Sequence, residues 1–448
     1  MQTPTTRNLS DSAAARWSAL FIVAFTMMAA YYVNDVMAPL KTMLENEIGW
    51  TSGEFGFFTG AYSFLNVFLL MLIWGGLILD RFGIRFTGIL ATVLMVGGTA
   101  AEYFAITAFG GTAETFMGYK LDVFLASAGY SVFGVGAEVA GITVSKIIAK
   151  WFRGKELALA MGVQVALARI GSQAAYAVAL PMARAWHLDT PLLLGFVLLI
   201  GGLLAFVAFS FMDKKLDSQV AVSDGSADDK FSFSDVVAVV CNPGFWLIAL
   251  LCVLFYSCVF PFQKFATELM TSKYGVSENL AGLFAGLPAL GALLLTPVFG
   301  GMIDKVGRAA TIMIAGSAML ICVHSIYSLP FVTAPAVAIA LMIVLGIAFS
   351  LVPSAMWPSV AKIFPVKQLG TAYALIFFIQ NIGLFGVPAL IGWTLETQCK
   401  LPAGGYDYTL PMMIFTGIAV LALVVALLLK AADRRYGYGL EQANIKRD

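Results

Sequence analysis

The stretch that decides the fold is "GGLILDRFGIR", residues 75–85, because it recurs in the other half of the chain as "GGMIDKVGR", residues 300–308. Both copies fit the pattern G-x-x-x-D-[RK]-x-G, and Asp80 and Asp304 stand half the chain length apart. A repeat at this separation indicates an internal duplication. The motif residues to which we assign a conformational role are Gly76, Asp80, Arg81, Gly83 and Arg85, and Gly300, Asp304, Lys305, Gly307 and Arg308.

The composition of this motif suits a turn at a membrane surface. Its glycines let two helices approach closely, its aspartate can accept hydrogen bonds from helix amides and basic groups, and its basic residues hold the turn at the interface. Anchoring by positive charge alone would explain the basic residues but not the repeated spacing of Gly and Asp. We therefore expect a specific role for both turns.

Outside the two motifs, most of the chain is apolar. Of its 448 residues 60% are hydrophobic and only 12% charged, and its mean hydropathy is +0.87, whereas soluble domains carry about 25% charged residues. Apolar runs of about 20 residues, long enough to cross a bilayer as helices, recur along the chain. They predict an all-α membrane protein with twelve spans, at 17–39, 55–79, 86–108, 118–148, 156–184, 190–212, 243–268, 278–302, 309–329, 333–361, 370–394 and 408–431.

The distribution of charge predicts the orientation. Most of the 27 lysines and arginines fall on one side of the predicted bilayer if the N-terminus is cytoplasmic, so the positive-inside rule places both termini in the cytoplasm. The expected units are a tail at 1–16, a six-helix bundle at 17–212, a polar linker at 213–235 with partial disorder, a second bundle at 236–432 and a tail at 433–448. The basic residues form no single face, which excludes nucleic acid as a partner, and the five cysteines show no metal or disulfide spacing. We expect no cofactor and no metal.

The ionisable residues that we identify inside the predicted spans are few, namely Asp35, Glu138, Arg169 and His324. Glu138 lies 13 residues before Trp151, and Arg169 lies 14 residues after Lys155, on the two sides of the loop "WFRGKE". At 1.5 Å per residue both groups lie about 20 Å from that loop, so an acid and a base share one depth on antiparallel neighbours. One interpretation is a salt bridge that pins the two helices; buried pairs often fail to offset their desolvation cost. The other is a cavity site that holds a zwitterion, with an amino group on Glu138 and a carboxylate on Arg169.

Two further ionisable residues have weaker assignments. Asp35 lies near the end of its span, so a gating or coupling role competes with substrate contact, and His324 is typical of a satisfied core histidine. We expect no buried carboxylate in the second half. Its polar groups, which we expect to contact the substrate, are Tyr256, Trp357, Gln380 and Asn381. A proton-coupled mechanism needs an acid whose pKa shifts, and only Glu138 and Asp35 could serve. The sequence therefore slightly favours facilitated transport over proton coupling.

The paired loops, twelve spans and central linker resemble the major facilitator superfamily. That resemblance implies two six-helix halves that rock about a site at the middle of the membrane. Within the superfamily the chain resembles the branch of lysosomal dipeptide uniporters. The resemblance is carried by residues 55–85, "WFRGKELALAMGVQVALARIGS" at 151–172, "VFPF" at 259–262, "PVFGGMIDKVGR" at 297–308, "MWPSVAKIFP" at 356–365 and "QLGTAYALIFFIQNIGL" at 368–384.

The resemblance to this branch implies a carrier of dipeptides without an obligatory ion gradient. The peptide termini would be held by a glutamate and an arginine that fall on Glu138 and Arg169, and the other positions that it carries into the cavity are Tyr62, Asn66, Trp357, Gln380 and Asn381. The chain lacks the acidic dileucine signal of the animal proteins, and Asn8, its only N-x-[ST] site, would face the cytoplasm. A bacterial inner-membrane relative is the simpler interpretation, and a lysosomal membrane is the alternative.

Three function classes remain in competition. The first is an alternating-access carrier of dipeptides or similar zwitterions, working as a monomer in the bilayer, with the need for an accessory protein left open. The second, a proton-coupled or exchange carrier of an organic anion such as a monocarboxylate, would use Arg169 for the anion and Glu138 for coupling. The third is a membrane sensor without transport, which only about 16 residues after the last span disfavour. No catalytic arrangement predicts an enzyme.

Overall fold

The computed structural model describes residues 8–152, 155–220, 233–365, 368–402 and 404–443. The first half contains η1 (Leu9–Asp11), α1 (Ala13–Val36), η2 (Ala38–Leu40), α2 (Lys41–Glu47), α3 (Ser52–Phe68), α4 (Met71–Phe109), β1 (Thr115–Phe116), β2 (Tyr119–Lys120), α5 (Leu121–Trp151), α6 (Leu157–Ala185) and α7 (Thr190–Val220). The second half contains α8 (Phe233–Val240), α9 (Pro243–Ser272), α10 (Glu278–Ala285), α11 (Leu287–Val306), α12 (Ala309–Ser328), α13 (Pro335–Ile363), α14 (Leu369–Gln398) and α15 (Thr409–Tyr436).

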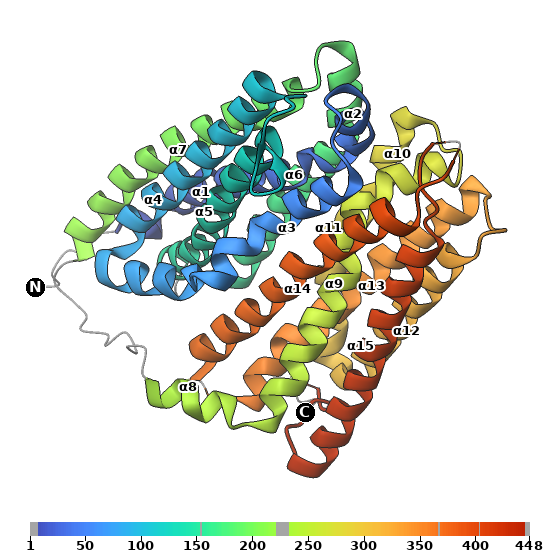
Figure 1. The fold of residues 1–448 in the computed structure, drawn as a ribbon. Helices are drawn as coiled ribbons and strands as arrows, with labels where there is room; N and C mark the ends of the chain where they lie inside the picture. Colours follow the sequence, from blue (N-terminus) through green and yellow to red (C-terminus); the bar gives the residue numbers. More distant parts are fainter. Residues whose placement is uncertain (1–7, 153–154, 221–232, 366–367, 403, 444–448) are drawn as a thin grey trace, which may run out of the picture.

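The helices form two bundles side by side, α1–α7 in blue to green and α9–α15 in yellow to red (Figure 1). In the first, α4 packs on α5 and α1 on α6 and α7; in the second, α11 packs on α13 and α12 on α15. Ten spans in the described part of the chain are long and apolar enough to cross a membrane. The other two expected spans correspond to α3, of 17 residues, and α6. The twelve-span arrangement is consistent with these helices.

Helix ends follow ordinary capping chemistry. Thr51 and Glu54 form a reciprocal capping box at the start of α3, which satisfies two amides that the helix leaves unpaired. Asn242 caps α9, and Pro243 follows at the first helical position, where its missing N–H has no cost. Both caps lie near the start of an expected span, so they help to fix where α3 and α9 begin.

Two of the expected spans are each divided in the structure. The expected span at 55–79 is interrupted at Leu70, which has a left-handed backbone (φ 53°), so α3 ends at Phe68 and α4 begins at Met71. The expected span at 278–302 is divided at Gly286 into α10 and α11. No proline or glycine marks the break at Leu70, so the apolar pattern of the sequence did not predict it.

The duplicated motif forms the same turn twice. Gly83 interrupts α4 with φ 76°, and Gly307 separates α11 from α12 with φ 74°. Residues with a Cβ rarely adopt this conformation, so the repeated glycine has a backbone reason. The Asp80 side chain is bound by Lys146 of α5 at 2.9 Å, and Arg81 packs over the ring of Phe82. We call the end of the molecule with these turns the inner end, and the end with the β1–β2 hairpin the outer end.

The start of the expected linker is helical. Helix α7 continues to Val220 because Asp213 and Asp217, one turn apart, bind Lys150 of α5 at 2.8 and 2.6 Å. Arg85 of the motif also contacts Asp217, at 3.3 Å. The centre of the linker, 221–232, lies outside the described residues. The salt bridges therefore hold α4, α5 and α7 together at the inner end.

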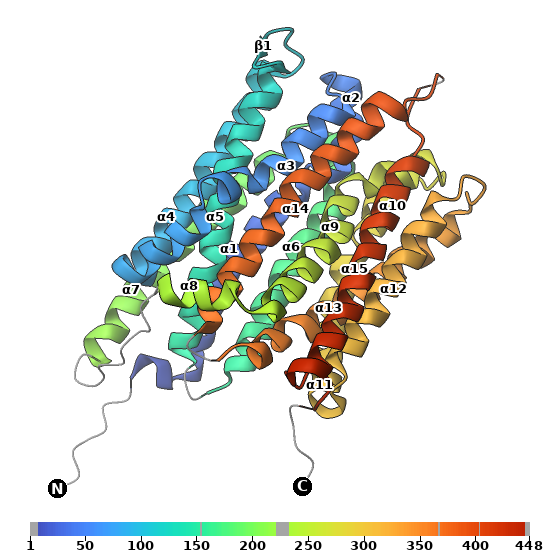
Figure 2. The ribbon, with the colours of Figure 1, turned by 60° about the horizontal axis from the view of Figure 1, so that its bottom comes forward.

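The chain returns to the inner end after α15. Residues 437–443 fold back over the second motif: Arg308 donates its amide to the carbonyl of Glu441, and the Glu441 side chain accepts from the Thr311 amide at 2.8 Å. In the first bundle Arg16 donates two hydrogen bonds to Glu156, and these hold the pKa of the Glu156 carboxyl below its usual range. The beginning of α1 and the end of α15 lie at the same end of the molecule (Figure 2).

Candidate functional site

The two bundles are joined tightly toward the outer end. A Cβ added to Gly56 of α3 would lie 2.5 Å from the carbonyl oxygen of Pro388 of α14, and one added to Gly60 would lie 2.5 Å from that of Phe385. Only glycine allows two helices to approach this closely. Figure 1 shows α3 and α14 side by side across the boundary between the bundles.

Three ion pairs in the described part of the chain join the bundles, and all lie toward the outer end. Asp35 of α1 binds Lys264 of α9 at 2.8 Å, and both residues are 8% exposed. Lys41 binds Glu268 at 2.7 Å, and Tyr408 donates a hydrogen bond to the same carboxylate. The third pair is Arg184 with Glu278. We call the pairs Asp35–Lys264 and Lys41–Glu268 the outer ion layer.

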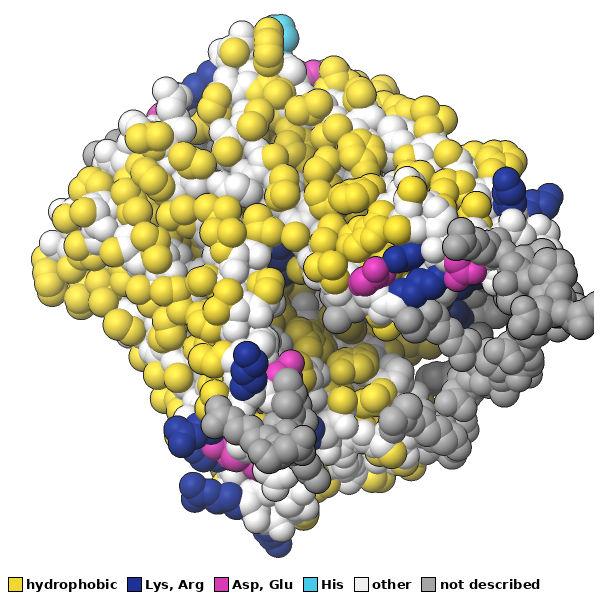
Figure 3. Space-filling view, turned by 180° about the vertical axis from the view of Figure 1, so that it is seen from behind, with side chains coloured by type: hydrophobic (Ala, Val, Ile, Leu, Met, Phe, Trp, Pro, Cys, Tyr) yellow, Lys and Arg dark blue, Asp and Glu magenta, His cyan; other side chains and the backbone are white. Residues whose placement is uncertain are grey.

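The surface is hollowed on the opposite side of this layer. Figure 3 shows a depression between the bundles, with apolar side chains in it and charged side chains grouped at its margins. The contacts between bundles described above lie at the outer end. The structure is therefore closed at the outer end and open toward the inner end.

Glu138 and Arg169 lie at similar depths but do not form an ion pair in the described structure. Glu138 stands 13 residues before the end of α5 and Arg169 stands 12 residues after the start of α6, about 20 and 18 Å from the inner ends of their helices. Both side chains are half-buried. Glu138 accepts a hydrogen bond from the Tyr62 hydroxyl of α3 at 3.1 Å.

Arg169 is surrounded by aromatic rings from both bundles. Its guanidinium carbon lies 4.9 Å from the ring centre of Phe349, 5.5 Å from Tyr31 and 5.9 Å from Phe260. Cation–π contacts of this kind stabilise a charge by about 0.5–2 kcal/mol. They leave the N–H donors at the edge of the guanidinium unused, since Arg169 makes no hydrogen bond to another described residue. Those donors are free to bind an anion.

Aromatic residues connect the two charges to the second bundle. Tyr31 lies within electrostatic range of both Arg169 and Glu138. Tyr256 stacks on Phe260 with ring centres 5.4 Å apart and accepts a hydrogen bond from the Trp357 indole at 3.0 Å. Five of the predicted site residues, Glu138, Arg169, Tyr62, Tyr256 and Trp357, therefore belong to this central region, which we call the central site together with Tyr31, Phe260 and Phe349.

The structure does not bring the predicted amides to the two charges. Gln380 accepts a weak hydrogen bond from the Cys252 thiol at 3.4 Å, and Asn381 donates to the carbonyl of Phe377 on its own helix. Asn66 is fully buried, and its amide atoms have no partner among the described residues. Their place in substrate binding stays a prediction.

The sequence analysis missed several buried charges. Glu102 contradicts the expectation that only Glu138 and Asp35 are acids inside the spans, and Glu268 contradicts the expectation of no buried carboxylate in the second half. Lys264 and Glu268 are four residues apart on α9, inside or at the edge of the predicted span at 243–268, so their spacing on one helix face was a usable signal. Lys41 was assigned to an outer loop by the charge count. Glu102, in the predicted span at 86–108, is fully buried in α4. His324 is the core histidine that the sequence favoured, buried with its ring stacked on Phe415.

Breaking the outer ion layer should open the outer end. Lys264→Met leaves the Asp35 carboxylate buried without its partner, and removing one member of a buried pair costs about 3–5 kcal/mol. We expect the fraction of protein that is open at the outer end to rise at least tenfold, which corresponds to about 1.4 kcal/mol or more. The measurement is the rate at which a cysteine introduced as Asn34→Cys reacts with a polar thiol reagent. Lys400→Met, which removes an exposed pair with Glu396, is the control. Unchanged labelling in Lys264→Met would contradict this role.

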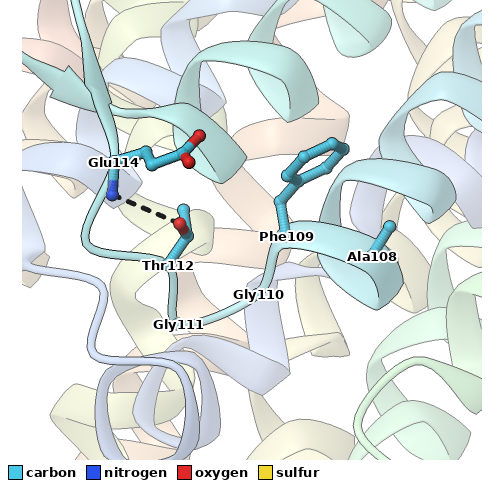
Figure 4. Close-up of a pocket in the computed structure, with 6 residues that line it drawn as sticks. All are labelled: Ala108, Phe109, Gly110, Gly111, Thr112 and Glu114. Atoms are coloured by element: carbon cyan, nitrogen blue, oxygen red, sulfur yellow. Dashed lines mark hydrogen bonds between the residues drawn. The ribbon is translucent and has the colours of Figure 1, made fainter.

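Two surface depressions lie away from the central site. One, of about 270 Å³, is formed by the loop after α4 and is lined by Phe109, Gly110, Thr112 and Glu114 (Figure 4). The other, of about 460 Å³, lies above the outer ion layer, between Glu45, Glu268 and Glu396. In the described residues no cluster of three or more His, Cys, Asp or Glu could hold a metal ion.

Two apolar helical bundles that meet at one end and enclose an acid and a base at mid-depth define a membrane transporter of the alternating-access class. The family model of the Major Facilitator Superfamily matches residues 20–388 and 265–443, and the chain belongs to this family. The fold and family are those of transporters and not of enzymes.

Curated relatives agree with this family. The chain is 28% identical to the lysosomal dipeptide transporter MFSD1 of Homo sapiens over 450 residues, covering 97% of this chain and 90% of that protein. It is 27% identical to the inner membrane transport protein YdiN of Escherichia coli (strain K12), over 41% of this chain and 40% of that protein.

Solved structures share the fold. A mutant of the nucleoside transporter NupG aligns with TM-score 0.71 and 12% identity over 92% of this chain and 99% of that chain. A bacterial homolog to the human lysosomal transporter Spinster, in an inward-facing and occupied conformation, aligns with TM-score 0.69 and 14% identity over 94% and 98%.

Proposed function

We propose that the chain is a uniporter of dipeptides, with the peptide amino group held by Glu138 and the carboxylate held by Arg169. The observation that carries the proposal is that these opposite charges, half-buried at one depth, do not neutralise each other. Each retains capacity for a ligand: Glu138 has one hydrogen bond, from Tyr62, and Arg169 has only ring contacts. A zwitterion would supply the missing partner of each.

The aromatic surroundings support binding of a peptide and not of a bare ion. Phe260, Phe349 and Trp357 supply apolar surface beside the charges, which suits side chains of varied size. The likeness to the lysosomal dipeptide transporter MFSD1 over nearly the whole chain supports the same substrate class. Because the inner end carries the turns rich in basic residues, the proposal places it and both termini in the cytoplasm, in a bacterial inner membrane.

Counterflow in proteoliposomes tests the proposed substrate. Vesicles loaded with an unlabelled dipeptide mixture should accumulate a labelled dipeptide transiently, while vesicles loaded with free amino acids or monocarboxylates should not. Equal accumulation at equal and unequal pH across the membrane, with the pH of the outer solution held constant, would support uniport. Accumulation driven by monocarboxylates and not by dipeptides would replace the proposal with an organic-anion carrier.

A further inference from the structure

Glu102 is a buried acid that has no role in the proposed binding of a dipeptide. It is 0% exposed, and neither carboxyl oxygen has a hydrogen-bond partner among the described residues. It stands seven residues before the outer end of α4, about 10 Å inward. Gly129 of α5 packs against its backbone, since a Cβ there would lie 2.8 Å from the Glu102 amide nitrogen, so this close neighbour offers no side-chain donor.

The charged groups around Glu102 come from three helices. Lys264 of α9 and Tyr130 of α5 interact with it electrostatically. The Lys264 ammonium, however, already donates to the Asp35 carboxylate at 2.8 Å and to the carbonyl of Asn34 at 2.5 Å. The Tyr130 hydroxyl donates to the same carbonyl at 2.7 Å. The Lys264 ammonium thus interacts with two carboxyl groups, but it forms its ion pair with Asp35 and not with Glu102.

Among the residues that the structure describes, the other neighbours of Glu102 add no compensating charge. Helix α7, which packs on α4, carries no ionisable residue from Thr190 to Met212. Asp122, at the outer start of α5, is bound by the Trp50 indole at 3.0 Å and the Gly111 amide. An ionised carboxylate without donors in a membrane interior costs several kcal/mol. Glu102 is therefore neutral, with its proton bound, in the state that is closed at the outer end.

Opening of the outer end would change this environment. Asp35 and Glu102 belong to the first bundle and Lys264 to the second, so separation of the outer ion layer removes the ammonium and admits water at the depth of Glu102. A hydrated carboxyl group ionises at neutral pH. We propose that Glu102 is a proton-binding site, and that closing the outer end takes up one proton there from the outer water, which converts the carboxylate to the neutral acid.

This inference rests on the alternating-access movement and not on the identity of the substrate. The consequence is that the pH of the outer solution controls the equilibrium between the outward-open state and the state closed at the outer end, with or without substrate. Alkaline outer solution favours the outward-open state, because closure must then bury an ionised group. Acidic outer solution favours closure. The proton is bound or released at Glu102, and no other bond is made or broken.

A distance measurement between the bundles tests the inference without substrate. Spin labels at Glu47→Cys on α2 and Gln398→Cys on α14, both exposed at the outer end, report opening in a background with the exposed Cys241 and Cys322 changed to Ser. For one linked proton the ratio of open to closed protein should rise by up to about tenfold per pH unit above the ordinary carboxyl range.

Variants at Glu102 show whether the pH response comes from its titration or from a change in packing. Glu102→Gln and Glu102→Leu, which cannot ionise, should stay closed across the whole range, whereas Glu102→Asp should keep the pH response. Glu114→Gln, in the exposed loop after α4, should behave like the wild type. A wild-type distance distribution that is the same at all pH values, or a full pH response in both neutral variants, would overturn the inference. Since no dipeptide is present, failure of the proposed substrate would leave this result unchanged.

Discussion

Arg169→Gln is expected to abolish dipeptide binding. The substitution leaves a polar side chain but removes the charge and the planar pair of donors that hold a carboxylate. Losing one partner of a desolvated charge pair costs about 2–5 kcal/mol, which weakens binding about 30-fold to several thousand-fold. Isothermal titration of the purified protein with a dipeptide measures the change directly.

Two further variants give this prediction its controls. Arg169→Lys keeps the charge without the two-point geometry, so its affinity should fall between those of the wild type and Arg169→Gln. Arg434→Gln, an exposed arginine at the inner end of α15, should bind as the wild type does. Wild-type affinity in Arg169→Gln would show that Arg169 stabilises only the fold.

Gly56→Leu is expected to eliminate transport by preventing closure of the outer end. A Cβ at Gly56 would meet the Pro388 carbonyl at 2.5 Å and the Gly392 Cα at 2.9 Å, and these are backbone atoms that cannot rotate away. Overpacking by even small groups costs about 1–3 kcal/mol, and the whole leucine side chain adds to this. Dipeptide counterflow should fall below about 1% of the wild type, a change of about 2.8 kcal/mol.

The same substitution at an exposed glycine is the matched control. Gly386, also on α14, is exposed, and a Cβ there would meet nothing within 4 Å. Gly386→Leu should therefore retain counterflow. If Gly56→Leu transports at the wild-type rate, the contact between α3 and α14 is not part of the transport cycle.

The architecture was predictable because apolar periodicity, charge asymmetry and the repeated motif each depend on local sequence. The common depth of Glu138 and Arg169 followed from counting residues on either side of a single turn, and the helix bounds keep that depth. The left-handed turn needed at Gly83 and Gly307 explains why the motif repeats its glycine. The break at Leu70 was not predictable, because leucine has no preference for the left-handed backbone found there.

The charges between the bundles could not be placed from a one-dimensional count. The charge count assigned Lys264 to the outer side of the membrane but did not predict that it is buried against Asp35. Whether a charge near a helix end faces water or another helix depends on how the two bundles dock. For the same reason the amides of Asn66, Gln380 and Asn381 fell in the expected spans but not beside Arg169. Docking of the bundles, not the sequence of either one, decides which polar groups meet.

The most direct test of the central claim is the affinity of wild type, Glu138→Gln and Arg169→Gln for one dipeptide with free, acetylated or amidated ends. Hydrogen bonds to charged groups contribute about 1.5–3 kcal/mol, or about 10- to 150-fold in affinity. Acetylation of the amine should therefore weaken binding to the wild type but not to Glu138→Gln, and amidation of the carboxylate should weaken binding to the wild type but not to Arg169→Gln. If each blocked peptide loses the same factor on all three proteins, Glu138 and Arg169 do not hold the peptide ends.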